Sequence, residues 1–185
     1  MIFPSLLLAL PALLPLAAAA PVRRDANSIN AALAVVSNRL VSLDSKINRF
    51  TGGVTPGEAI AAVEIQERGV ELQQDLGAAA NAVDQSAPLT DGESASVARA
   101  VASLAGNLYR VLDSLDRKRG EFNRPILDAK LASSRVKTAL QGLKSVTNDL
   151  GDALALKFSA SIGRAAPLVM SAINWHLDRA VEIYG

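Results

Sequence analysis

The chain has 185 residues, of which 19 are Lys or Arg, 18 are Asp or Glu, one is His and none is Cys. The near balance of charge argues against a nucleic-acid partner, because binding to phosphate backbones depends on clustered cations. The absence of Cys excludes disulfides and thiolate nucleophiles, and with one His the usual zinc sites are excluded as well.

The first 19 residues are predicted to be a secretory signal peptide. They carry no charged side chain and combine a leucine-rich run with a following stretch of alanines. Prolines interrupt the run, and a membrane-spanning helix needs about 20 consecutive apolar residues, so no transmembrane anchor is expected. Localisation is therefore predicted to be secreted and extracellular, with cell-wall association as a further option.

Residues 20–24 form a short leader that ends in Arg23-Arg24. The dibasic pair is either a site for a secretory-pathway protease or part of an ordinary polar leader, so the mature chain begins after Ala19 or after Arg24. Residues 25–185 are predicted to form a single domain. A domain of about 160 residues buries roughly two thirds of the surface of its unfolded chain.

The first amphipathic helix is predicted over residues 28–50. Large apolar side chains recur there at alternating steps of four and three, which places them on one face of a helix. They are Ile29, Leu33, Val36, Leu40, Leu43, Ile47 and Phe50. Gly52 and Gly53 are expected to end the helix and reverse the chain, because glycine takes positive φ without steric penalty.

The second and third helices are predicted from matching start signals. Thr55 is an N-cap with Pro56 at the first helical position and Glu58 as its capping-box partner, and Thr90 and Glu93 repeat the spacing. The apolar positions that follow are Ala62, Ile65, Gly69, Leu72, Leu76, Ala79, Val83, then Val97, Val101, Leu104, Leu108, Val111 and Leu115. The third helix is expected to end in basic residues and Gly120.

Gly69 and Gly77 need a reason, because each destabilises a helix interior by about 1 kcal/mol relative to Ala. One explanation is the close approach of a neighbouring helix. The other is room for a ligand chain between helices.

A fourth helix is predicted to start with Asn123 as its cap and to run to about residue 158, as one helix or as two pieces that bend at Gly142 or Gly151. Its apolar positions drift, which suggests contact on more than one side; they are Leu127, Leu131, Val136, Leu140, Leu143, Val146, Leu150 and Leu154. Pro167 lies early in a fifth helix, whose apolar positions are Met170, Ile173, Leu177, Val181 and Tyr184.

Five amphipathic helices joined by short loops, without β-type alternation, predict an all-α fold: an antiparallel bundle. An extended coiled coil is disfavoured because turn signals interrupt each pattern after about three heptads. Catalysis is not expected. A Ser-His-Asp arrangement would have to use His176, no Gly-x-Ser-x-Gly elbow is present, and no metal or cofactor site is predicted.

Several segments give the chain a family resemblance. They are an Ala-rich leader ending in Pro-Val-Arg-Arg-Asp, a helix closing with Phe50-Thr51-Gly52-Gly53, the run Asn123-Arg124-Pro125-Ile126-Leu127 and a last helix that starts with Pro. In these features the chain resembles the fungal family of hydrophobic surface binding protein A and cell wall galactomannoproteins, over essentially the whole mature chain.

The resemblance implies a secreted helical protein, since some relatives hold fatty acids inside the bundle and others adsorb to hydrophobic surfaces and assist extracellular hydrolases. Two family features are missing. The chain has neither a Ser/Thr-rich stalk with a hydrophobic tail nor an Asn-x-Ser/Thr acceptor, so a soluble, single-domain member without N-glycosylation is expected.

The first function hypothesis is a secreted, non-enzymatic protein that holds a fatty acid or other lipid between its helices. Burying a 16-carbon chain is worth roughly 12 kcal/mol before the costs of association, so an affinity near micromolar is expected. The cavity is placed between the first, second, third and fifth helices. Its expected lining is Leu33, Val36, Leu40, Ile65, Leu72, Leu104, Leu108, Ile173 and Leu177.

Three alternatives stay open. The same residues would equally fill a solid core. In the second alternative, the bundle opens and its apolar faces adsorb to hydrophobic surfaces, as amphipathic helices lie on lipid. A secreted wall component or effector is the third, and it has no sequence feature of its own.

Overall fold

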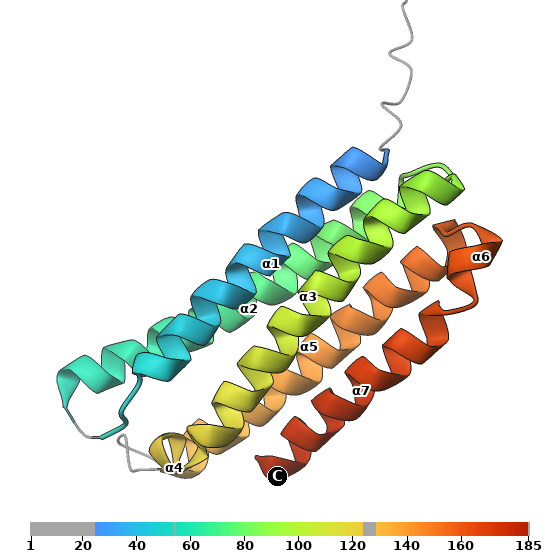
Figure 1. Ribbon diagram of the computed structural model, residues 1–185. Coiled ribbons are helices and arrows are strands. Elements are labelled where there is room, and N and C mark those ends of the chain that lie inside the picture. Colours follow the sequence, from blue (N-terminus) through green and yellow to red (C-terminus); the bar gives the residue numbers. More distant parts are fainter. Residues whose placement is uncertain (1–24, 54, 124–128, 185) are drawn as a thin grey trace, which may run out of the picture.

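The computed structural model describes residues 25–53, 55–123 and 129–184, and these segments form a helical bundle (Figure 1). Five long helices run along the bundle, and two helices of four residues cap its ends. The long helices are α1 (Ala26–Arg49), α2 (Pro56–Asp84), α3 (Asp91–Arg117), α5 (Ala129–Lys157) and α7 (Ala166–Ile183). The short ones are α4 (Arg119–Phe122) and α6 (Ala160–Gly163). The predicted all-α fold is confirmed.

Side-chain contacts set the neighbours and directions of the helices. Consecutive long helices are antiparallel, as the pairs Arg39–Asp75 between α1 and α2 and Asn174–Asn148 between α7 and α5 illustrate. Non-consecutive neighbours are parallel, because α1 and α3 are joined by hydrogen bonds at a nearly constant separation of 66 to 70 residues. The neighbours form a ring in the order α1, α2, α5, α7, α3.

The core lies inside this ring. Every apolar position predicted for α1 is buried, from Ile29 to Phe50, and the largest fully buried side chains also include Leu72, Leu108 and Leu177. The three-and-four spacing therefore identifies the inward face of each long helix. Ser37 and Asn107 join α1 to α3 at the edge of the core through a hydrogen bond of 2.6 Å.

The N-terminal cap of α3 is as predicted, whereas the starts of α2 and α1 differ from the prediction. The Thr90 and Glu93 capping box is complete. At α2, Thr55 accepts the Glu58 amide, but the Glu58 carboxylate accepts hydrogen bonds from Thr51 instead of completing a box, because the preceding turn brings that residue within reach. Helix α1 begins earlier than predicted, at Ala26, because Asp25 accepts the amides of residues 27 and 28.

The end of α3 also differs from the prediction. The chain continues from Arg117 through Lys118 into α4, so Gly120 lies inside a helical turn. This turn buries Phe122 against Phe50, with ring centroids 4.7 Å apart.

The predicted cap Asn123 is instead the residue that ends α4, with its amide donating to the Arg119 carbonyl. The start of the fourth predicted helix falls on residues 124–128, which lie outside the described residues, as do the predicted signal peptide and leader. From Ala129 the fourth helix is one continuous element, because Gly142 and Gly151 accommodate the side chains of Gln73 and Met170 and not a bend.

Candidate functional site: an apolar cavity beside α5

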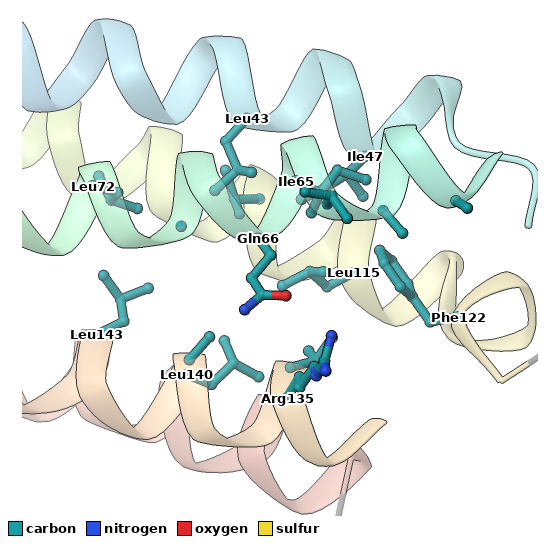
Figure 2. A pocket seen from close by; sticks show the side chains of 17 residues that line it. Leu43, Ile47, Ile65, Gln66, Leu72, Leu115, Phe122, Arg135, Leu140 and Leu143 are labelled. Carbon is teal, nitrogen blue, oxygen red and sulfur yellow. The ribbon is translucent and has the colours of Figure 1, made fainter. Parts of the chain in front are cut away.

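One half of the bundle, near α4, is hollow. A cavity of about 330 Å³ lies between α1, α2, α3 and α5, and ligand pockets usually have roughly 300 to 1,000 Å³. Its lining residues are Leu43, Ile47, Ala59, Ala62, Val63, Ile65, Gln66, Gly69, Leu72, Val111, Leu115, Phe122, Arg135, Val136, Ala139, Leu140 and Leu143. Figure 2 shows these side chains converging from the helices.

The cavity has a floor and a mouth. The lining residues of α1 and α3 are all buried, so these helices close the floor. The exposed lining residues are Val63 and Gln66 of α2 and Arg135 of α5, which places the opening between α2 and α5. The walls are otherwise apolar, so the space favours a hydrocarbon chain over a polar molecule.

Small residues create the space. Ala59, Ala62 and Gly69 of α2 face Ala139 of α5 across the cavity. A Cβ built on Gly69 or Gly77 meets nothing within 4 Å among the described residues, so the close approach of a neighbouring helix explains neither glycine. At Gly69 the alternative explanation, room between helices, fits the structure.

The end of the cavity next to α4 is closed by a tightly packed turn. Phe122 contacts the cavity and stacks on Phe50, while the Lys118 ammonium donates to the Phe50 carbonyl at 2.8 Å. Tyr184, the residue that follows α7, packs edge-on against Phe122 and donates to the Leu115 carbonyl at 2.8 Å. Burial raises the pKa of the Tyr184 phenol, so this group stays a neutral donor.

The predicted lining residues fall into two groups. Ile65 and Leu72 line the cavity. The other seven are packed in the core outside it: Leu33, Val36, Leu40, Leu104, Leu108, Ile173 and Leu177. The cavity lies next to α5 and not next to α7, because α5 is the ring neighbour of α2.

The predicted lining did not include the residues of α5, such as Leu140 and Leu143. It also did not include Phe122 or the polar residues Gln66 and Arg135 at the mouth. The drifting apolar pattern of the fourth predicted helix was the available signal for α5. A helix that contacts the core, the cavity and α7 needs apolar residues on more than one side.

His176, the candidate for a catalytic triad, does not line the cavity. His176 stacks on Tyr109 with ring centroids 4.2 Å apart and is half-buried. Among residues 25–53, 55–123 and 129–184, no group of three or more His, Asp or Glu side chains is placed to hold a metal ion. In the same segments, no helix is long and apolar enough to cross a membrane.

Comparison with known proteins places this bundle in a family. The profile described as Hydrophobic surface binding protein A matches residues 26–156, so the chain belongs to this family. No curated protein sequence matches it.

Solved structures share the fold. AFMP4P in complex with palmitic acid is similar over 87% of this chain and 100% of that chain, with 22% identity and a TM-score of 0.79. Ligand binding domain 2 of the Penicillium marneffei MP1 protein, complexed with multiple arachidonic acids, matches over 89% and 98% of the two chains, with 14% identity and a TM-score of 0.75. Domain 1 of that protein, complexed with arachidonic acids, has a TM-score of 0.68 over 88% and 99%, at 18% identity.

Proposed function

We propose that this protein is a secreted, non-enzymatic carrier that holds a fatty acid or similar single-chain lipid in the cavity between α1, α2, α3 and α5. The observation that carries the proposal is the apolar cavity of about 330 Å³ with one open side. The solved relatives with this fold are complexes with palmitic or arachidonic acid, which supports the same class of ligand here. The expected affinity is about micromolar.

Two measurements test the proposal. Denaturing extraction of the purified protein followed by mass spectrometry should release fatty acid, and titration of the delipidated protein with palmitate should give a saturable heat. Gly69→Leu should block binding by filling the cavity, whereas Gly77→Leu, which has open space but lies outside the lining, should bind normally. Circular dichroism checks that both variants fold. The carrier function would be refuted if wild-type protein released no lipid on extraction and did not bind palmitate.

Secretion and processing belong to the same proposal. Cleavage after Arg24 would leave Asp25 as the first residue, and Asp25 is the N-cap of α1, so processing there would keep the first helix intact. N-terminal sequencing of the protein from culture medium should find Asp25 or Ala20 as the first residue. Cell-associated protein that still begins at Met1 would contradict secretion and processing.

A second candidate function, adsorption to hydrophobic surfaces, is favoured by a different feature. Leu168 and Trp175 lie seven residues apart on one face of α7 and are 76% and 58% exposed, and Leu156 at the end of α5 is 80% exposed. The family description supports this use. The double variant Leu168→Ser, Trp175→Ser should lose adsorption to alkyl-coated beads, with Gly69→Leu as the control that keeps it. Unchanged adsorption of the double variant would exclude α7 as the adsorbing face.

A further inference from the structure

The mouth of the cavity carries two polar side chains on an otherwise apolar lining. Gln66 comes from α2 and Arg135 from α5, and both are exposed. In Figure 2 the Gln66 amide reaches into the space between α2 and α5, and the Arg135 guanidinium stands at the same opening. The remaining lining residues are Ala, Val, Leu, Ile, Phe and Gly.

Among the described residues, Arg135 is unpaired, unlike Lys46 of α1 and Arg68 of α2. Lys46 pairs with Glu64, and Arg68 pairs with Glu71 at 2.9 Å. Within the segments that the structure describes, Arg135 has neither an ion-pair partner nor a hydrogen-bonded acceptor. Its planar guanidinium offers donors that match a carboxylate with two parallel bonds.

We propose that Arg135, assisted by the Gln66 amide, binds the carboxylate of the lipid and makes the cavity selective for anionic over neutral single-chain lipids. This inference rests on the proposed carrier function. The floor consists of buried apolar side chains of α1 and α3, where a carboxylate would lose its hydration without gaining a partner. The tail therefore enters first, and the head stays at the mouth beside Arg135.

The expected effect is moderate because Arg135 is exposed to solvent. Ion pairs at exposed positions are weakened by water and salt, so removal of the charge should reduce affinity for an ionised fatty acid by about 2- to 5-fold. The same removal should leave a neutral lipid of equal length unaffected, because its hydroxyl forms a hydrogen bond of similar strength with Gln.

The test compares palmitate with 1-hexadecanol, both delivered from cyclodextrin at about pH 8, in wild type, Arg135→Gln and the control Arg164→Gln. Arg164 follows α6 at the opposite end of the bundle from α4 (Figure 1) and makes the same change of charge. We expect Arg135→Gln to lower palmitate affinity by about 2- to 5-fold and to flatten its salt dependence. Hexadecanol affinity should not change in either variant.

The outcomes separate the two proposals. If wild type binds both lipids and Arg135→Gln binds palmitate as tightly as wild type, the role of Arg135 is refuted. The carrier function is unaffected by that result. Equal weakening of both lipids also overturns the role of Arg135, because that result indicates a damaged cavity and not a lost charge. Wild type that binds neither lipid overturns the carrier function and this inference together.

Discussion

Gly52 makes the reversal between α1 and α2 depend on a residue without a side chain. Its φ is +68°, and a Cβ there would lie 2.5 Å from the Glu121 carbonyl oxygen. The turn therefore packs directly on the backbone of α4, which closes the cavity end.

Gly52→Ala should consequently destabilise the fold by about 2 to 4 kcal/mol, through strain at positive φ and through displacement of α4. Urea denaturation measures the loss. Gly57→Ala is the matched control, because a Cβ there has open space and the residue lies in the first turn of α2. Equal stability of the two variants would show that the contact with Glu121 is unimportant.

Glu58 ties the same turn to α2 electrostatically. The Thr51 hydroxyl donates to its carboxylate at 2.6 Å, and the amides of Thr51 and Gly52 donate as well, so the pKa of Glu58 lies below its ordinary value of 4.5. A lowered folded-state pKa means that the stabilisation is complete above the ordinary value and disappears as the pH falls through the folded-state value.

Glu58→Gln should therefore unfold at lower urea concentration than wild type at pH 7, and the difference should shrink towards about pH 3. The control is Glu67→Gln, at an exposed position of the same helix. A difference between Glu58→Gln and wild type that is independent of pH would mean that the carboxylate charge does not stabilise the turn.

At the scale of elements, a polar contact joins α1 and α3 in parallel register. The Ser114 hydroxyl is buried, donates to Asp44 at 2.6 Å and accepts from Asn48 and Arg117. Ser114→Ala removes a group that satisfies three side chains, so it should destabilise the fold by about 1 to 2 kcal/mol. Thermal denaturation measures this. Ser103→Ala, at an exposed position of α3, should be neutral, and an equal effect of both would assign the loss to helix propensity.

The periodicity of the sequence was sufficient to predict the long helices and their buried faces. Helix α1 illustrates why: its apolar residues repeat at helical spacing, and each of them packs inward. Periodicity carries no information about which helices become neighbours. The predicted lining therefore used Ile173 and Leu177 of α7, whereas the cavity borders Leu140 and Leu143 of α5.

The position of the cavity was not predictable from residue size. Ala79 and Ala80 of α2 pack in the solid core, whereas Ala59, Ala62 and Gly69 of the same helix line the cavity. These small residues were visible in the sequence. Their meaning was not, because an alanine that faces a cavity and one that permits close packing look the same until the helices are placed.

For the whole molecule, an unfilled apolar cavity with an open side means that stability should respond to its occupant. A ligand that binds the folded state alone adds about 2.7 kcal/mol of stability at a concentration 100 times its dissociation constant. For a domain of this size, palmitate should then raise the melting temperature by about 5 to 10 °C. Gly69→Leu should melt without a shift, because its side chain occupies the space of the tail, and Gly77→Leu should respond like wild type. Equal melting temperatures with and without palmitate in wild type would mean that the hollow half does not admit the lipid.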